Sequence, residues 1–260
     1  MSASTRQRRE VIVNEIYENG HVGVRDLALG LGVSQATVRR DLRALAAGHR
    51  IELVYGGAML ARTSDYSFRS KATRNVEAKR VIGRLAAALV AEGDQVFLDS
   101  GTTVFEMAPF LKRRRGLSVI VNSARLAMEI DMSGPNVILL GGQYRPDRLD
   151  TVGPLAITTL EQLRGYVAFV GADGLSMDFG LTANDIESAH LYRLAIRNAR
   201  ETVLLVDHSK FAKPSLFKIV DFDAVTRIVT DQSPSPEWGE FLAAKDIEVI
   251  CPRPEEKTAQ

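Results

Sequence analysis

Apolar positions in the first 60 residues recur at helical spacing in three short segments. Residues 6–19 and 24–31 each place such side chains on one face, as amphipathic helices do. A third helix is expected over 34–47, because this segment opens on a serine, a good N-cap residue, and then repeats its apolar positions every three or four residues. Along residues 51–58, apolar and polar positions first alternate as in a short strand, and the chain then turns at two glycines. Three small helices followed by a hairpin predict a winged helix over residues 1–60.

Beyond residue 76 the pattern changes to short β-branched runs that alternate with helical stretches. The expected strands cover residues 95–99, 118–122, 136–140, 166–170, 202–206, 227–230 and 247–250. Helices are expected over residues 77–91 and near residues 103–112, 123–130, 153–163 and 186–199. Strand–helix alternation predicts an α/β domain built on a doubly wound, mostly parallel sheet.

The polar segments outside these patterns complete the predicted organisation. Residues 61–76 are polar and weakly patterned, so we interpret them as a linker. Residues 253–260 are interpreted as a polar tail. The sequence therefore predicts a winged helix-turn-helix domain at 1–60, joined by the linker to an α/β domain at 77–252.

Composition and charge narrow the function classes. The chain has 260 residues, of which 45% are hydrophobic and 25% charged, with a net charge of +1. Residues 1–80 hold 14 Lys/Arg and 8 Asp/Glu, so the predicted winged helix and linker are basic and the rest is acidic. Such asymmetry suggests that one part meets a polyanion.

Several further classes of protein are disfavoured because the sequence lacks the residues or segments that they need. A single cysteine, Cys251, excludes an internal disulfide and a Cys-rich zinc site. The longest apolar run, residues 85–91, is far shorter than the roughly 20 residues that span a bilayer. The polar start shows no secretory signal, and no glycine-rich nucleotide motif is present. We therefore expect a cytoplasmic protein without a membrane partner, a metal or a cofactor.

Residues 24–45 have the layout of a helix-turn-helix, in which the second helix enters a major groove. Glutamine there can read adenine and arginine can read guanine, while threonine contacts a thymine methyl or a phosphate. Further arginines would fix the register on phosphates, and residues 55–57 would form the tip of the wing. The candidate DNA-binding residues are Arg6, Ser34, Gln35, Thr37, Arg39, Arg40, Arg43, Tyr55, Gly56 and Gly57.

Two of these side chains have a second interpretation. Arg40, together with Asp41, could pair with neighbours on a solvated helix surface. Tyr55 could pack beneath the hairpin, since tyrosines often bury the ring and leave the hydroxyl in water. Asp41 itself is expected to be structural and not to read a base.

Small and hydroxyl-bearing residues follow several of the expected strands. The turn at 99–103 joins a strand to a helix, where backbone N–H groups and the helix dipole favour an anion such as phosphate. In a doubly wound sheet, such loops converge on one crevice at the carboxyl ends of the strands. Basic side chains there would bind a phosphate, and carboxylates and an amide would bind hydroxyls. The candidate effector-binding residues are Asp99, Ser100, Gly101, Thr102, Thr103, Asn122, Ser123, Gly141, Gly142, Arg145, Asp173 and Lys210.

Along nearly its whole length, the chain resembles the DeoR family of bacterial transcriptional regulators. In the predicted winged helix the resemblance rests on residues 33–42, which read VSQATVRRDL, and on residues 55–58, which read YGGA. In the α/β domain it rests on LDSGTT (98–103), GGQYR (141–145), VGP (152–154), FVGADG (169–174) and DHSKF (207–211). The resemblance implies a C-terminal sensor domain that is similar in fold to ribose-5-phosphate isomerase and that binds a phosphorylated sugar or a similar metabolite.

The chain departs from the family pattern at three places. Tyr55 stands where the wing usually has histidine. Residues 188–189 read Ser-Ala where a Glu-Ala pair is common, and Tyr192 stands where lysine is usual. These departures predict an altered wing contact and an altered part of the effector pocket.

These observations predict a transcriptional regulator, of the repressor type, that controls a carbohydrate-catabolism operon. A phosphorylated sugar or related metabolite would modulate its binding to double-stranded operator DNA, and a homodimer or homotetramer would meet paired half-sites. The alternative from another class is a sugar-phosphate isomerase-like enzyme with an accessory DNA-binding domain. Such an enzyme would use acid–base groups of the same crevice, such as Asp99, Asp173 or Lys210.

Overall fold

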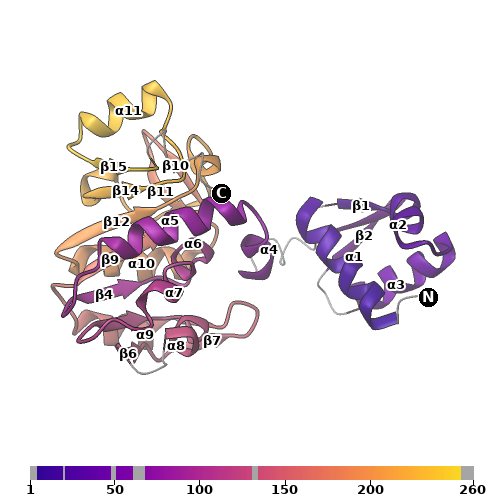
Figure 1. The fold of residues 1–260 in the computed structure, drawn as a ribbon, viewed down its shortest axis with the longest axis horizontal. Helices are drawn as coiled ribbons and strands as arrows, with labels where there is room; N and C mark the ends of the chain where they lie inside the picture. Colours follow the sequence, from indigo (N-terminus) through magenta and orange to yellow (C-terminus); the bar gives the residue numbers. More distant parts are fainter. Residues whose placement is uncertain (1–4, 20, 48–50, 61–67, 131–133, 253–260) are drawn as a thin grey trace. The chain divides into compact units, whose positions relative to one another are not determined.

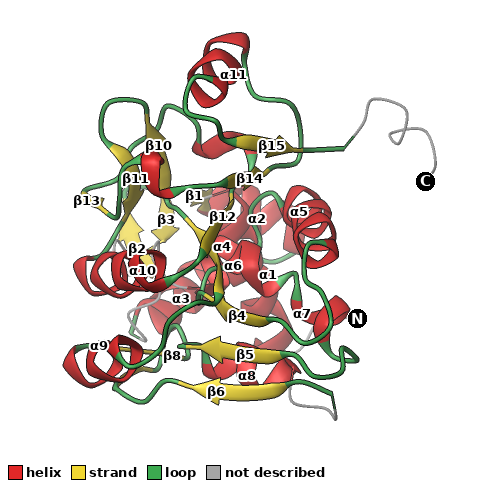
Figure 2. Cartoon of the chain, turned by 90° about the vertical axis from the view of Figure 1, so that its left-hand side faces the viewer, coloured by secondary structure: helices red, strands yellow, loops and turns green. Residues whose placement is uncertain are grey.

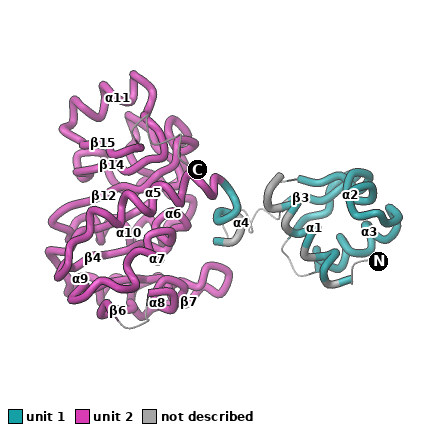
Figure 3. Tube along the Cα trace, viewed as in Figure 1, with its two compact units in different colours: residues 1–74 teal, residues 75–260 magenta. Residues whose placement is uncertain are grey.

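The computed structural model describes residues 5–19, 21–47, 51–60, 68–130 and 134–252 (Figure 1). It separates into two compact units, residues 1–74 and residues 75–260 (Figure 3). The predicted tail at 253–260 lies outside the described residues. So do residues 61–67 of the predicted linker, whose remaining residues include a helix, α4 (Phe68–Ala72).

Unit 1 forms the winged helix that the sequence predicts. Its strands make an antiparallel sheet in the order β1-β3-β2, against which the helices pack around a small apolar core. The elements are α1 (Thr5–Asn19), β1 (His21–Gly23), α2 (Val24–Leu31), α3 (Gln35–Ala46), β2 (Ile51–Val54) and β3 (Gly57–Leu60).

Two local features set the turn between α2 and α3. Gly32 ends α2 in the left-handed region, with φ of 62°, a conformation that glycine adopts without strain. Ser34 caps α3, because its side chain accepts a hydrogen bond from the backbone N–H of Thr37 at 3.2 Å. Val38 and Leu42 are then buried on the inner face of α3, as their spacing predicts.

The strand β1 is not evident in the sequence, because three residues are too few to show an alternating pattern. It pairs with β3 in a close approach that depends on Gly57. A Cβ atom at Gly57 would lie only 2.1 Å from the carbonyl oxygen of Val22. Gly57 is therefore a buried sheet residue, whereas the sequence interpretation placed it in the tip of the wing.

The described part of unit 2 is built on a sheet of seven strands, all parallel, in the order β15-β14-β12-β9-β4-β5-β6. Each strand coincides with an expected one, and no bound differs by more than one residue. The strands are β4 (Gln95–Leu98), β5 (Ser118–Val121), β6 (Asn136–Leu139), β9 (Val167–Gly171), β12 (Glu201–Leu205), β14 (Arg227–Val229) and β15 (Glu248–Ile250).

Helices cover both faces of this sheet, so the fold is a doubly wound α/β domain. Side chains of the same strand alternate between two apolar cores, as Phe97 and Leu98 do. One core lies under α5 (Val76–Ala88), α6 (Thr102–Phe105), α7 (Ala108–Leu111) and α8 (Ala124–Ile130). The other lies under α9 (Pro154–Glu161), α10 (Ile186–Asn198) and α11 (Pro236–Ala243).

The remaining elements correct the sequence interpretation in detail. The single helix expected near 103–112 is two short helices, α6 and α7, and α11 was not expected. Two small antiparallel sheets stand beside the main one, and their short strands carry no clear alternation. They are formed by β7 (Gln143–Arg145) with β8 (Asp150–Val152), and by β10 (Gly174–Ser176), β11 (Gly180–Ala183) and β13 (Phe217–Lys218). The 3-10 helices are η2 (His208–Lys210) and η3 (Phe222–Ala224).

The order of the main sheet reverses between β4 and β9. From β4 the chain proceeds outward through β5 and β6, and it then returns to the other side of β4 for β9, β12, β14 and β15 (Figure 2). In doubly wound sheets, a ligand crevice is expected beside such a reversal, at the carboxyl ends of the strands. Among the described residues, no helix is both long enough and apolar enough to cross a lipid bilayer.

Candidate functional site

The outer face of α3 presents polar and basic side chains to solvent. Gln35, Arg39, Arg40 and Arg43 are all exposed. Arg39 donates a hydrogen bond from Nη2 to Oε1 of Gln35 at 3.3 Å, so these two groups form one polar surface at the start of the helix. The geometry fits a recognition helix, whose N-terminal residues contact base edges.

The capping hydroxyls lie at the same end of α3. The Oγ of Ser34 and the Oγ1 of Thr37 are 2.9 Å apart, and Ser34 also accepts from the backbone. Both residues therefore have a structural role at the helix start, next to the candidate base-reading side chains. The side chain of Arg6, on α1, lies outside the described part of the structure.

Asp41 anchors the back of α3 to α1. It is buried, and its two carboxylate oxygens accept hydrogen bonds from Nε of Arg8 at 2.7 Å and Nε of Arg9 at 2.8 Å. Burial alone would raise the pKa of Asp41, but the two arginines outweigh it and hold the pKa below its usual value. Asp41 is structural, as expected, although its partners are on α1 and not beside it on α3.

The turn between β2 and β3 carries the candidate wing residues. Tyr55 is fully exposed, so the interpretation in which it packs beneath the hairpin is wrong. Gly56 has φ of 77°, a turn conformation that favours glycine, and its carbonyl accepts a hydrogen bond from Val24 at 2.8 Å. Tyr55 thus stands at the tip of a hairpin that is tied back to α2.

In unit 2, several predicted effector residues follow strands at the carboxyl edge of the main sheet. Asp99, after β4, lies at the point where the strand order reverses. Its carboxylate accepts from the backbone N–H of Gly101 at 2.7 Å and from that of Gly171, the last residue of β9, at 2.6 Å. A Cβ at Gly101 would lie 2.8 Å from Asp99, so glycine is needed for this tight turn. Asp99 therefore holds the loops of β4 and β9 together.

Asn122, after β5, has one polar atom that is not satisfied. Its side chain is fully buried, and its Nδ2 donates to the carbonyl of Thr151 at 3.0 Å. Its Oδ1 has no hydrogen-bond partner among the described residues. An unpaired buried oxygen costs stability unless something else donates to it, so Oδ1 is a candidate acceptor for a ligand hydroxyl. The adjacent Ser123 is buried and caps α8 by accepting from Leu126 at 3.2 Å.

Arg145 is held by acidic side chains, which changes the role expected of it. Its Nε and Nη2 donate to the two oxygens of Asp150 at 2.8 and 2.7 Å, and its Nη1 donates to Asp185 at 2.9 Å. Burial would lower the pKa of Arg145, but Asp150 and Asp185 raise it above its usual value. Because Asp150 and Asp185 neutralise most of its charge, Arg145 is poorly suited to be the main phosphate-binding cation.

A connected polar network extends from Arg145 through Asp150 to Ser100, a predicted effector residue, and to Tyr192, which the sequence marked only as a departure from the family pattern. Ser100 donates to Asp150 at 2.8 Å and accepts from the hydroxyl of Tyr192 at 2.8 Å. Tyr192 is buried, and burial together with Asp99 and Asp150 raises its pKa well above the usual value, so it remains a donor. The replacement of lysine by Tyr192 was the signal in the sequence that this part of the pocket differs.

The network also includes residues at the start of α10. Arg148 forms an ion pair with Asp185, and Nη2 of Arg145 donates to Ser188 at 3.0 Å. Burial would raise the pKa of Asp185, but the arginines and the N–H of Ser188 hold it well below its usual value. Two arginines and two aspartates thus form an electrically balanced cluster. No sequence pattern marked Asp150, Asp185 or Arg148. Asp185 is 40 residues from Arg145, and the short β7–β8 hairpin that places Asp150 opposite Arg145 shows no clear alternation.

The other predicted residues take different places around the edge. Asp173 accepts from the N–H of Asn184 at 2.8 Å, which holds the loop after β9. Lys210, in η2 after β12, is partly exposed. Its ammonium group makes no hydrogen bond or ion pair within the described residues, and its charge helps to lower the pKa of Asp207. The remaining residues are the buried first residues of α6 and the glycines between β6 and β7, namely Thr102, Thr103, Gly141 and Gly142.

Comparison with protein families matches both units. A model described as the DeoR-like helix-turn-helix domain covers residues 8–64, and one described as the DeoR C terminal sensor domain covers residues 74–232. Ribose 5-phosphate isomerase A of Methanocaldococcus jannaschii is a structural neighbour with a TM-score of 0.40 and 21% identity. The matched region covers 54% of this chain and 56% of the isomerase chain.

Relatives of similar length are named as transcriptional regulators. The regulator GlpR of Haloferax volcanii is 30% identical over 94% of this chain and 96% of its own. The lactose phosphotransferase system repressor of Lactococcus lactis is 32% identical over 89% of this chain and 93% of its own. The repressor GlcR of Bacillus subtilis is 30% identical over 96% of this chain and 97% of its own. The chain therefore belongs to the DeoR family, as a DNA-binding transcriptional regulator and not an enzyme.

Proposed function

We propose that this protein represses a carbohydrate-catabolism operon and that a phosphorylated sugar or related metabolite relieves the repression. The ligand binds in the crevice at the carboxyl edge of the main sheet and weakens the binding of unit 1 to operator DNA. Relatives named as a lactose phosphotransferase system repressor and as the repressor GlcR support the carbohydrate context. The site of action is the cytoplasm, where the operator is accessible.

The observation that carries the effector proposal is the buried, unpaired Oδ1 of Asn122. It lies after β5, the neighbour of β4, at the edge where the order of the strands reverses. A hydroxyl of the ligand supplies the missing donor. Lys210, whose ammonium group is unpaired within the described residues, supplies the positive charge for a phosphate. An unpaired acceptor and an unpaired cation at one sheet edge suit a hydroxylated phosphate ester.

The proposal also assigns roles to the groups that are already paired. Asp99 and Asp173 shape the loops that surround the ligand, because both accept hydrogen bonds from backbone N–H groups. The cluster around Arg145 forms a rigid wall. On α3, Arg39 and Gln35 read base edges, while Arg40, Arg43 and the wing contact the DNA backbone.

The loop that contains Lys210 is tied to the first residue of unit 2. Nδ2 of Asn75 donates to Asp207 at 2.9 Å and to Oγ of Ser209 at 3.1 Å. Asn75 has φ of 51° and precedes α5 directly. A ligand that moves this loop therefore acts on the residue where the chain leaves unit 2 toward unit 1. To change DNA binding, it must bind the DNA-free arrangement more tightly than the DNA-bound one.

Paired half-sites require more than one copy of unit 1, so we propose a homodimer or homotetramer. Sedimentation equilibrium at micromolar protein measures the mass directly. A mass of about two or four times 28.5 kDa is expected. A mass that remains at 28.5 kDa, both free and on operator DNA, contradicts the assembly.

The decisive experiment selects genomic DNA fragments with the purified full-length chain and sequences them. Enrichment of a few promoters with paired half-sites is expected, and the neighbouring genes nominate the sugar phosphates to test. Fluorescence anisotropy on the enriched operator then measures the release of DNA as each sugar phosphate is added. The unphosphorylated sugar serves as the control ligand, and it should release the DNA much less effectively.

Two variants locate the effector site. Lys210→Gln should raise the concentration of sugar phosphate needed for release by about tenfold, as expected for a lost charge-assisted hydrogen bond. The control variant Lys112→Gln should leave it unchanged, because Lys112 pairs with Glu129 and follows α7, on the segment that leads to the start of β5 at the opposite edge of the sheet. Equal responses of the two variants would reject the crevice as the phosphate site. Selection without enriched promoters, in the presence and absence of sugar phosphates, would reject operator recognition itself.

A further inference from the structure

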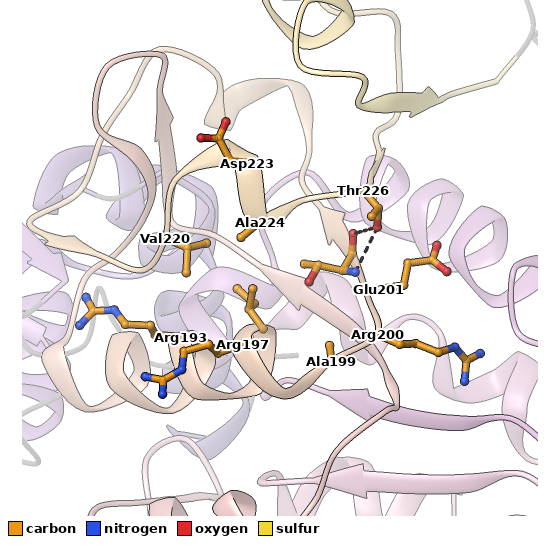
Figure 4. A pocket seen from close by; sticks show the side chains of 11 residues that line it. Arg193, Arg197, Ala199, Arg200, Glu201, Val220, Asp223, Ala224 and Thr226 are labelled. Atoms are coloured by element: carbon orange, nitrogen blue, oxygen red, sulfur yellow. Dashed lines mark hydrogen bonds between the residues drawn. The ribbon is translucent and has the colours of Figure 1, made fainter.

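A separate pocket lies at the other end of the main sheet. It has a volume of about 290 Å³ and is formed between the C-terminal half of α10, the start of β12 and the segment that leads into β14 (Figure 4). The strands are parallel, so their starts are at the edge opposite to the crevice. The size is near the lower end of the range that small-molecule sites occupy.

The pocket combines an apolar lining with basic side chains. Ile196, Val220 and Ala224 contribute apolar groups, and Figure 4 shows Val220 and Ala224 across from the helix that carries Arg193 and Arg197. The two arginines are four residues apart on α10, so they project from the same face of the helix. Figure 4 shows both guanidinium groups extending away from Val220 and Ala224, so they stand at the rim of the apolar pocket that these residues line.

Within the described part of the chain, no acidic side chain forms an ion pair with either of these two arginines. Arg193 donates only to carbonyl oxygens among its described partners, including that of Ile219 at 2.8 Å. Arg197 makes no hydrogen bond or ion pair within the described residues and is exposed. By contrast, Arg200, at the far side of the pocket, pairs with Asp94 at 3.2 Å.

The acids that line the pocket are already engaged elsewhere. Asp223 pairs with Lys245, and Glu201 pairs with Arg227. Neither acid has a contact with Arg193 or Arg197 among the described ion pairs. The pocket therefore retains uncompensated positive charge next to an apolar lining, a combination that attracts an anion with an apolar body.

We propose that this pocket binds a small organic anion, in which a phosphate or carboxylate group is attached to an apolar body. Arg197 and Arg193 bind the anionic group, and guanidinium forks match either a carboxylate or a phosphate. The apolar body lies against Ile196 and Val220. The site is distinct from the crevice and does not depend on the sugar-phosphate proposal.

Helix α10 is common to this pocket and the crevice. Its first half carries Ser188 and Tyr192, which contact Arg145 and Ser100 in the crevice network, while Arg193 and Arg197 follow in its second half. A ligand at either end that shifts the helix changes the other end as well. Any such coupling between the two ligands must be reciprocal.

The chain contains a suitable optical reporter. Its single tryptophan, Trp238, packs on Phe222 with ring centroids 5.7 Å apart, and Phe222 adjoins Asp223 in η3. Trp238 also packs on Phe211, which follows Lys210, with centroids 5.1 Å apart. Trp238 fluorescence is thus sensitive to both sites, and variants are needed to separate them.

The test titrates the full-length chain with phenyl phosphate and, separately, with benzoate, while Trp238 fluorescence is recorded. Benzyl alcohol and benzamide are the uncharged controls. Saturable binding of at least one anion, with at least tenfold weaker binding of its uncharged control, is expected. Arg197→Gln should weaken binding of that anion by about tenfold, the loss typical of one charged hydrogen bond. Arg84→Gln, which removes an exposed arginine from α5 on the other face of the sheet, should leave it unchanged.

Each contrary result overturns the proposal in a different way. Equal affinity for the anions and their uncharged controls would show an apolar site without anion selectivity. Equal losses in Arg197→Gln and Arg84→Gln would show attraction by net charge alone. Binding that is lost in Lys210→Gln and retained in Arg197→Gln would assign the anion to the crevice. Failure of anion binding at this pocket can therefore be distinguished from failure of sugar-phosphate binding in the crevice.

Discussion

The arginines of α3 and those of the crevice differ in where their acidic partners are. Arg39, Arg40 and Arg43 are exposed and have no ion pair among the described residues. Arg145 and Arg148 are mostly buried and paired with aspartates. The first group is available to a polyanion, whereas the second is committed to holding loops together.

The comparison shows that residue type alone does not define a phosphate site. A guanidinium that already faces two carboxylates has little charge left for a ligand. Removing it leaves buried carboxylates without a counter-charge, which destabilises the fold. An unpaired guanidinium on a solvated helix contributes little to stability. The two groups should therefore respond in opposite ways to the same substitution.

The largest effect is expected for Arg145→Met. The substitution leaves Asp150, which is fully buried, without its cationic partner, and it should lower the free energy of unfolding of unit 2 by about 3–5 kcal/mol. Urea unfolding followed by Trp238 fluorescence measures it, because Trp238 reports on unit 2 alone. Arg39→Met is the matched control and should change the same quantity by less than about 0.5 kcal/mol. Similar values for the two variants would remove the distinction between the arginine groups.

Asp41→Asn tests the buried carboxylate of unit 1 in the same way. It removes the charge that pairs with Arg8 and Arg9, so unit 1 should lose about 3 kcal/mol of stability. Amide hydrogen exchange in α3 measures this loss. Asp26→Asn, which changes an exposed carboxylate on α2, is the control and should have little effect. Unchanged exchange rates in Asp41→Asn would show that the contact between α1 and α3 does not depend on the charge.

The same variant has a defined pH dependence. The folded-state pKa of Asp41 is lowered, so its ion pairs stabilise unit 1 above the unfolded-state value of about 3.9. This stabilisation is lost as the pH falls through the lower, folded-state pKa. The difference in α3 exchange between the wild type and Asp41→Asn should therefore be largest near neutral pH and shrink in acid. A difference that grows in acid would contradict the pKa direction.

Much of the fold could be predicted from the sequence, because its information is local. Ser34 and the spacing of Val38 and Leu42 predict α3, and β-branched runs predict each strand of the main sheet. The small sheets and β1 escape prediction because their strands have too few residues to show a period. Their pairing also depends on contacts such as that between Gly57 and Val22, which are distant in sequence.

The candidate site is only partly predictable for the same reason. The turn at 99–103 and Asn122 are visible as polar residues that follow apolar strands, and the structure places both at the carboxyl edge. The pairing of Arg145 with Asp150 and Asp185 cannot be read from the sequence. Asp150 faces Arg145 across the short β7–β8 hairpin, and the contact with Asp185 depends on how α10 packs beside β8. Burial and partners, which decide whether a charge is available to a ligand, are properties of the tertiary structure.

The variant Arg39→Ala tests whether an exposed arginine of α3 reads a base in the operator. If Arg39 reads a guanine, the variant should lose about 1–3 kcal/mol of binding free energy on the operator and much less on random DNA. Fluorescence anisotropy at a fixed salt concentration measures both, since phosphate contacts depend strongly on salt. Arg43→Ala is the matched variant, and it should weaken binding to both DNAs alike if Arg43 contacts phosphates. Equal losses on both DNAs in Arg39→Ala would reassign Arg39 to the DNA backbone.

The smallest effect is expected where the crevice network contains an uncharged contact. Tyr192→Phe removes the hydroxyl that donates to Ser100, and a neutral hydrogen bond contributes about 1 kcal/mol to stability. Tyr166→Phe is the matched control, because its buried hydroxyl donates to the carbonyl of Ala195 at 3.0 Å, away from the predicted effector residues. Both variants should lose similar stability in urea unfolding.

Their responses to the sugar phosphate should differ. Tyr192→Phe frees Ser100 beside Asp150, which alters the floor of the crevice, so the concentration of sugar phosphate that releases operator DNA should shift by several-fold. Tyr166→Phe should release the DNA at the wild-type concentration. If both variants release it at that concentration, Tyr192 stabilises the fold without shaping the effector site. The substitution of lysine by tyrosine at this position would then have no bearing on ligand choice.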